Sequence, residues 1–134
     1  MLATHLSDNH IWGIDPNAKT GAALVEVPGV NSTQSIVELA DDVLLFTAGN
    51  LSPSMLAVPG SWGVWKVDLS GTTNTGQAPV PEKVSNCPGA ARMDGIAVWD
   101  GSRVLVSDSE GSKVHIIDFT TGACEVAIDR AESG

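Results

Sequence analysis

The chain has 134 residues, 43% of them hydrophobic and 17% charged, so it can bury the core of one modest domain and is neither disordered nor fibrous. The formal net charge is −9 and the seven Lys and Arg residues are scattered singly, so no nucleic-acid partner is expected. The longest apolar stretches, residues 43–48 and 95–99, are too short to span a bilayer, so no membrane partner is expected either.

An internal repeat links the start of the chain to its end. Residues 1–15 align without a gap with residues 104–118, and both segments read as two consecutive strands. A short turn and the tripeptide Thr-Gly-Ala follow in each copy, before a further strand at residues 23–27 and at residues 124–128. We therefore predict that residues 1–30 form the outer part of one structural unit.

The middle of the chain, residues 31–88, repeats this unit with an interruption. Strands are predicted at residues 35–39, 43–50 and 62–68, and residues 51–61 are inserted between the last two. The inserted segment is unusually apolar for a loop. It is expected either to pack over the fold or to form a lid.

The last unit, residues 89–134, begins with a strand at residues 95–99 and continues with the repeat already described. Its strands are rich in β-branched residues, and Asp100-Gly101 is typical of a hairpin turn. No segment of the chain keeps apolar residues at helical spacing for three turns. The predicted fold class is therefore all-β.

Four antiparallel strands that recur every 40 to 50 residues or so are typical of a β-propeller blade. We expect about two and a half to three blades of a six-bladed ring, in the ranges 1–30, 31–88 and 89–134. An open sandwich is the alternative, but it does not explain a repeat that covers four strands in order.

An unclosed propeller leaves strand edges and blade faces exposed, so three outcomes are open. The chain is a piece of a longer propeller bound to the remainder, or it pairs with a second copy of itself, or it is a decayed gene product. Met1 falls inside a strand, at the position that Val104 occupies in the last copy, so the start looks imposed on an existing fold. We favour the first outcome.

Two sequons point to the secretory pathway or an extracellular location. Asn31-Ser32-Thr33 and Asn50-Leu51-Ser52 are both acceptors for N-glycosylation, although no signal peptide is recognised at the start of this chain. The two cysteines, Cys87 and Cys124, form either a disulfide or two buried thiols.

The candidate ligand site lies where the innermost strands of the blades begin, because this end and the loops between second and third strands line a funnel at one face of a propeller. The polar and aromatic residues expected there are Gln34, Asn50, Trp62, Met93, Asp94 and Asp108. By the repeat, His5, Thr47 and Asp108 are predicted to be equivalent, as are Trp12, Trp65 and His115.

Each of these candidates also has a structural interpretation. Asp94 can ligate a hard metal or act as a general base, and it can equally cap the turn before Gly95. Asp108 is expected to cap a turn more often than to bind a ligand. Trp62 follows the inserted segment and either staples that loop or offers an apolar wall to a ligand. No sequence motif identifies a catalytic residue.

Three segments carry a family resemblance: residues 43–50, residues 59–68, and Asp94-Gly95 followed by residues 104–109. With them the chain resembles the fungal TolB-like six-bladed propellers related to the SMP-30/gluconolactonase superfamily. This group includes hetero-Diels–Alderases of natural-product pathways, which join a tropolone quinone methide to a terpene polyene.

The resemblance implies two enzymatic functions. The first is a hetero-Diels–Alder-type cycloaddition of small apolar intermediates, which needs no cofactor because the protein orients the partners and polarises one of them. The second is a lactone hydrolase that holds a divalent metal on the axis, for which Asp94 matches a ligand position and Gln34 departs from the pattern. A non-catalytic propeller fragment is the third reading.

Overall fold

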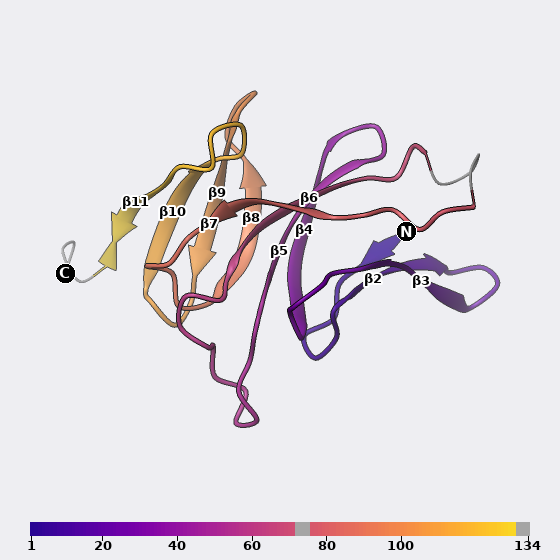
Figure 1. Cartoon of the computed structure of the whole chain (residues 1–134), viewed down its shortest axis with the longest axis horizontal. Helices are drawn as coiled ribbons and strands as arrows, with labels where there is room; N and C mark the ends of the chain where they lie inside the picture. The colour runs from indigo at the N-terminus through magenta and orange to yellow at the C-terminus, as the bar shows by residue number, and fades with distance from the viewer. Residues whose placement is uncertain (72–75, 131–134) are drawn as a thin grey trace.

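The computed structural model describes residues 1–71 and 76–130, and these residues form eleven strands and no helix (Figure 1). None of them therefore belongs to a helix long and apolar enough to cross a membrane. The strands are β1 (Leu2–Ala3), β2 (His10–Asp15), β3 (Thr20–Glu26), β4 (Ser32–Ala40), β5 (Val43–Gly49), β6 (Gly63–Asp68), β7 (Glu82–Asn86), β8 (Met93–Val98), β9 (Arg103–Asp108), β10 (Lys113–Asp118) and β11 (Cys124–Asp129).

The strands form three separate antiparallel sheets. The first sheet has the order β1-β2-β3, the second β4-β5-β6-β7 and the third β11-β10-β9-β8. The strands of each sheet come from one of the three predicted ranges, 1–30, 31–88 and 89–134. Within these ranges, residues 72–75 and 131–134 lie outside the described residues. The prediction of an all-β fold is confirmed.

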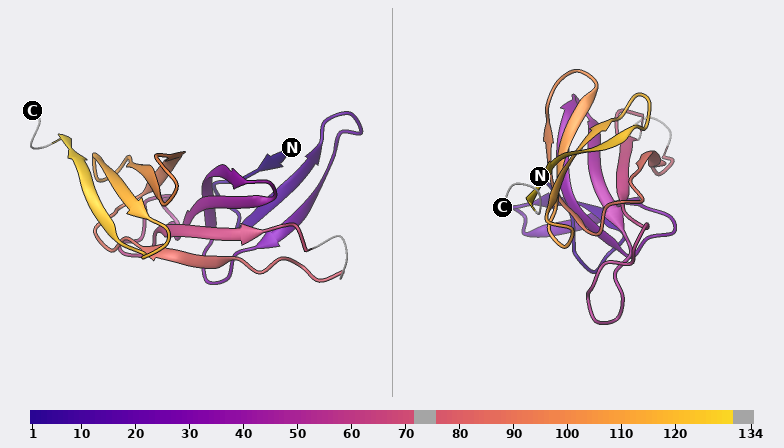
Figure 2. Two further views of the ribbon diagram at one scale, coloured as in Figure 1. Left: turned by 90° about the horizontal axis from the view of Figure 1, so that it is seen from above. Right: turned by 90° about the vertical axis from the view of Figure 1, so that its left-hand side faces the viewer.

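The sheets follow one another along the molecule, with the second sheet between the other two (Figure 2). Strand β5 explains why the second sheet is buried on both faces, because nearly all of its residues are apolar and successive side chains point to opposite sides. Leu44 and Phe46 belong to the core shared with the first sheet, whereas Leu45 belongs to the core shared with the third. One strand thereby joins two hydrophobic cores.

Strands β4 and β8 each form one edge of their sheet, and these two edges lie next to each other. The backbone N–H of Ile96 in β8 donates to Oγ of Ser35 in β4 at 3.3 Å. Adjacent first strands from successive sheets are the arrangement expected around the axis of a propeller. Both strands therefore begin at the same end of the molecule.

The register corrects one predicted equivalence. Ile36 pairs with Phe46 and Ile96 pairs with Val106, so Thr47 corresponds to Ser107 rather than to Asp108. A slip of one residue moves a side chain to the opposite face of a sheet, and only Ser107 places a hydroxyl where Thr47 has one. The prediction that Thr47 and Asp108 are equivalent is wrong.

The second equivalence is confirmed. Trp12 lies opposite Ala3, Trp65 opposite Phe46, and His115 opposite Val106, which is the same position in the three sheets. A planar side chain therefore recurs at this position, although a histidine replaces tryptophan in the third sheet.

Two parts of the sheets differ from the sequence prediction. The innermost strands begin at Ser32 and Met93, two or three residues before the predicted starts at Ser35 and Gly95. Strand β7 was not predicted as a separate element. Its sequence, EKVSN, contains a single β-branched residue and no alternation of apolar and polar side chains that would identify it.

The two cysteines are bonded to each other. Cys87 follows β7 of the second sheet and Cys124 opens β11 of the third, with their Cα atoms 5.7 Å apart. This separation is ordinary for a disulfide. Of the two alternatives left open by the sequence, the structure contains the disulfide, and it joins two neighbouring sheets.

Candidate functional site

Gln34 and Asp94 lie at breaks in the innermost strands. The pairing of β4 with β5 shifts between Thr33 and Ile36, and the pairing of β8 with β9 shifts between Met93 and Ile96. Bulges of this kind redirect a side chain and are common next to functional sites. The two side chains are thereby released from the regular alternation at the end where both strands begin.

Equivalent hydrogen bonds stabilise the two breaks. The N–H of Ser35 donates to Oγ1 of Thr47 at 3.1 Å, and the N–H of Gly95 donates to Oγ of Ser107 at 2.8 Å. A side-chain hydroxyl on the second strand thus replaces the lost backbone acceptor. The bulge is therefore a repeated feature of the fold and not a local irregularity.

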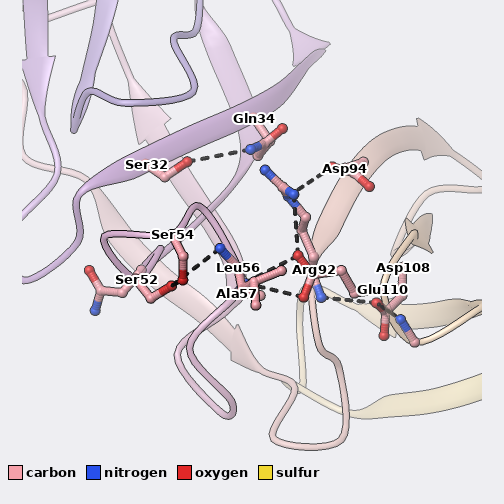
Figure 3. A network of polar contacts seen from close by, with 12 residues as sticks. Ser32, Gln34, Ser52, Ser54, Leu56, Ala57, Arg92, Asp94, Asp108 and Glu110 are labelled. Carbon is pink, nitrogen blue, oxygen red and sulfur yellow. Dashed lines mark hydrogen bonds and ion pairs between the residues drawn. The ribbon is translucent and has the colours of Figure 1, made fainter.

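Arg92 connects the acidic side chains at this end of the molecule (Figure 3). Its Nη1 lies 3.2 Å from Oε1 of Glu110, and its Nε lies 3.7 Å from Oδ1 of Asp94. The Nε group is buried and has no hydrogen-bond partner, because 3.7 Å is too long for a hydrogen bond. We call Gln34, Arg92, Asp94 and Glu110 the rim cluster.

The inserted segment is fixed at both of its sides. The carboxylate of Glu110 accepts from the N–H of Ala57 at 3.1 and 3.2 Å, which ties the segment to the third sheet. The side-chain amide of Asn31 donates to the carbonyl of Leu51 at 2.9 Å and accepts from the N–H of Leu51 at 2.8 Å. The insertion is therefore held over the junction of the sheets, with Met55 at its exposed end.

A hollow of about 300 Å³ opens between this insertion and the loop that joins β1 to β2. Its lining is mainly apolar, with a few polar groups: Leu6, Ser7, Asn31, Leu51, Ser52, Pro53 and Met55. Its volume lies at the lower end of the range for small-molecule pockets.

Asp108 does not face this site, because its side chain is completely buried. Its carboxylate accepts from the backbone N–H groups of Ala91, Arg92 and Gly111 at 2.8 to 2.9 Å, and Nε2 of His115 lies 3.2 Å away. Burial by itself would raise the pKa of Asp108, but these hydrogen bonds together outweigh burial and lower it. Asp108 is thus an ionised cap that fixes the backbone beneath Arg92.

Two further candidates are buried as well. Trp62 and Met93 both have no exposed surface and belong to the core between the second and third sheets. Trp62 packs against Gly49, whose missing side chain leaves the space for the indole. The prediction that Trp62 offers an apolar wall to a ligand is wrong, because the indole is completely buried in the described chain and no ligand can reach it.

The remaining candidates, Gln34, Asn50 and Asp94, are partly exposed. Gln34 donates to Oγ of Ser32 at 3.4 Å, which positions its side chain within the rim cluster. The sequence prediction placed Glu110 only within a loop, residues 108–112, expected near the funnel, and it gave no individual role to Glu110 or to Arg92. The available signal was position in the repeat: Arg92 directly precedes the innermost strand β8, and Glu110 lies in the loop between β9 and β10.

The rim cluster fits a divalent metal poorly. The cationic side chain of Arg92 lies beside Asp94, and the matching position of the second sheet offers only the neutral oxygen of Gln34. Among the described residues, the one group of three His, Cys, Asp or Glu side chains close enough to share a metal consists of Cys87, His115 and Cys124. Asp94 is not part of such a group.

The asparagines of both sequons lie at the junction of the first two sheets. Asn31 is bonded to Leu51 as described, and Nδ2 of Asn50 donates to the carbonyl of Gly29 at 3.2 Å. Glycosylation of Asn31 and Asn50 stays a prediction.

No family model matches the sequence, and a search of the curated proteins gives no match. Among solved structures, the chain is similar to one described as "Crystal structure of Nidogen/Laminin Complex", with a TM-score of 0.64 and 14% identity. The match covers 96% of this chain and 44% of that chain. At this identity the likeness shows the fold alone, and it fits a β-propeller. The chain therefore spans less than half the length of that solved chain.

Proposed function

We propose that this chain belongs to a propeller enzyme that binds a small, largely apolar, carbonyl-bearing molecule and assists its hetero-Diels–Alder-type cycloaddition. The observation that carries the proposal is the inserted segment, which is held by Asn31 and Glu110 and borders an apolar hollow of about 300 Å³. Reaction partners held in such a hollow lose translational freedom before they react. No covalent intermediate is required for this chemistry.

The rim cluster supplies the polar part of the proposed site. A cycloaddition of this kind accelerates when hydrogen-bond donors withdraw electron density from a carbonyl oxygen. Arg92 and Gln34 are the side-chain donors of the rim cluster, and Glu110 holds Arg92 in place at 3.2 Å (Figure 3). Arg92 is assigned to the polarising role and Glu110 to a positioning role.

A metal-dependent lactone hydrolase is the second candidate, and Asp94 is the residue that favours it. The nearby guanidinium of Arg92 competes with a divalent cation for this carboxylate, which makes the hydrolase the weaker reading. A propeller fragment that binds without catalysis is the third candidate.

Either enzyme would need further blades, because the axis of a propeller is enclosed by all of its blades. The two end sheets carry outward hollows, of about 420 Å³ beside Trp12 and Ile14 and about 290 Å³ beside Leu105 and Val114. Leu105 occupies the position of Leu45, and the third sheet covers Leu45 completely. We therefore propose that a further blade covers Leu105, supplied by the remainder of a longer chain or by a second copy.

A secretory or extracellular location is proposed as well. The disulfide between Cys87 and Cys124 supports it, since disulfides persist mainly in oxidising compartments. The two sequons, at Asn31 and Asn50, point the same way.

The test combines the protein with a tropolone quinone methide and a terpene polyene, and measures the yield and stereochemistry of the adduct against the uncatalysed background. An Arg92→Met variant is expected to lose most of the acceleration. Arg130→Met, at an arginine outside the rim cluster, serves as the control. Native mass spectrometry of the same samples establishes whether a ring has assembled.

Three outcomes separate the candidates. Acceleration that survives exhaustive chelation supports the cycloaddition and contradicts the metal-dependent hydrolase. Hydrolysis of lactones that disappears on chelation and returns with a divalent metal overturns the leading proposal. An assembled ring with neither activity contradicts both enzymes and leaves the binding fragment.

A further inference from the structure

Trp12, Trp65 and His115 occupy the same position in the three sheets, and His115 is the one that is not a tryptophan. His115 is 2% exposed and lies between two groups: Oδ2 of Asp108 is 3.2 Å from its Nε2, and Sγ of Cys124 is 3.8 Å from its Nδ1. Both ring nitrogens therefore point at a specific partner.

The chemistry of Asp108 determines which nitrogen of His115 carries the proton. The carboxylate of Asp108 accepts from three backbone N–H groups on its two oxygens, and a carboxylate only accepts hydrogen bonds. Nε2 of His115 must therefore donate to it. In the neutral imidazole this leaves a lone pair on Nδ1, directed at a sulfur atom that carries no hydrogen while the disulfide is intact. A buried acceptor without a donor is unusual in a folded protein.

We propose that reduction of the Cys87–Cys124 disulfide creates a zinc site formed by both thiolates and Nδ1 of His115. The three ligand atoms all lie within 4.8 Å of one another. In a tetrahedral site with Zn–S of about 2.3 Å and Zn–N of about 2.0 Å, a sulfur and a nitrogen ligand lie roughly 3.5 Å apart. The observed 3.8 Å between Cys124 and His115 is close to this value.

The surroundings support the proposed site. A zinc-bound histidine typically donates its other N–H to a carboxylate, which fixes the ring. In this protein the carboxylate of Asp108 already accepts from Nε2 of His115. Cys124 is partly exposed, so a water molecule can supply the fourth ligand. Cys87 is 2% exposed and forms the closed side of the site.

The switch between the two states is a balanced reaction. A dithiol transfers two electrons and two protons to the disulfide, the S–S bond breaks to give two thiols, and the dithiol becomes a disulfide. Zn²⁺ then replaces the two thiol protons, which pass to solvent. The oxidised protein joins β7 to β11 by a covalent bond, and the reduced protein joins them through the metal.

The test is a titration with Co²⁺ before and after reduction of the wild-type protein. The reduced protein is expected to develop the intense visible bands of tetrahedral Co²⁺ and a thiolate-to-cobalt charge-transfer band, which Zn²⁺ abolishes stoichiometrically. The oxidised protein is expected to show neither. His115→Asn is expected to weaken Co²⁺ binding at least tenfold, whereas His10→Asn, on the first sheet, leaves it unchanged.

The oxidised and reduced forms of one protein are compared, so the result does not depend on whether a variant folds. Reduced protein with two thiols accessible to a thiol reagent after unfolding, native circular dichroism and no thiolate-to-cobalt band would overturn the proposal. An unchanged affinity in folded His115→Asn would overturn the assignment of the nitrogen ligand. Neither result depends on the cycloaddition or on ring assembly.

Discussion

Gln34 and Asp94 occupy the same position in two adjacent innermost strands, each at a break in the pairing with the next strand. A hydroxyl on that next strand, from Thr47 or Ser107, accepts from the residue that follows. The position is therefore built by the fold, and the residue placed there is free to differ between blades. This freedom is what allows one scaffold to carry a neutral amide in one blade and a carboxylate in the next.

The link between Glu110 and the insertion leads to a first prediction. Replacement of Glu110 by Ala removes the acceptor for the N–H of Ala57, so this amide is expected to exchange with solvent about fivefold faster, the equivalent of ~1 kcal/mol. Because the contacts are partly exposed, global stability is expected to change by less than about 1 kcal/mol. Hydrogen exchange followed by mass spectrometry measures both, with Glu125→Ala as the control. Unchanged exchange at Ala57 would show that the link does not hold the insertion.

The contact between Gly49 and Trp62 leads to a second prediction. A Cβ atom built on Gly49 would lie 2.5 Å from Cδ2 of the Trp62 ring, and the indole is completely buried. Gly49→Ala is expected to lower the free energy of unfolding by about 1–3 kcal/mol, as overpacking does elsewhere. Gly101→Ala meets no atom within 4 Å and is the matched control. Urea denaturation compares the two, and equal midpoints would contradict the packing described for Trp62.

The buried carboxylate of Asp108 leads to a prediction about pH. Its pKa is lower in the folded protein than in the unfolded chain, where it is about 3.9. The stability that it contributes is therefore complete above the unfolded value and is lost as the pH falls through the folded value. Asp108→Asn is expected to be destabilised by several kcal/mol at pH 7, since buried N–H groups lose a charged acceptor.

The same variant provides the test of the sign. The stabilities of the wild type and of Asp108→Asn are expected to begin to converge as the pH falls below about 4, because the unfolded chain then takes up a proton before the folded protein does. Asp41→Asn, at an exposed acid, is the control. A stability difference that stayed constant from pH 7 to pH 3 would contradict an ionised Asp108.

The matched positions Leu45 and Leu105 lead to a fourth prediction. Leu45 is completely buried by the third sheet, so Leu45→Asp is expected to cost more than about 3 kcal/mol of stability. Leu105→Asp is expected to leave the isolated chain folded, within about 1 kcal/mol, and to abolish its association with further blades. Thermal denaturation and native mass spectrometry measure the two effects. Equal destabilisation by both variants would mean that Leu105 is already buried in the chain alone.

The sequence by itself determined the all-β class and the positions of most strands. Alternating β-branched residues with Gly and Asp turns specify strands locally, and the match of residues 1–15 to residues 104–118 depends on no contact between them. The equivalence of Trp12, Trp65 and His115 followed from the same match. Strand β7 was missed because its local pattern is weak, and it is a strand only because β6 pairs with it.

The tertiary structure decided which candidate residues reach a site. Thr47 was placed one residue out of register, since only the pairing of Phe46 with Trp65 and of Val106 with His115 fixes how β5 corresponds to β9. Whether Trp62 and Asp108 face solvent or the core depends on which sheet packs against them. The meeting of Cys87, His115 and Cys124 depends on the same packing, because residues far apart in sequence become neighbours only when two sheets bury a common core.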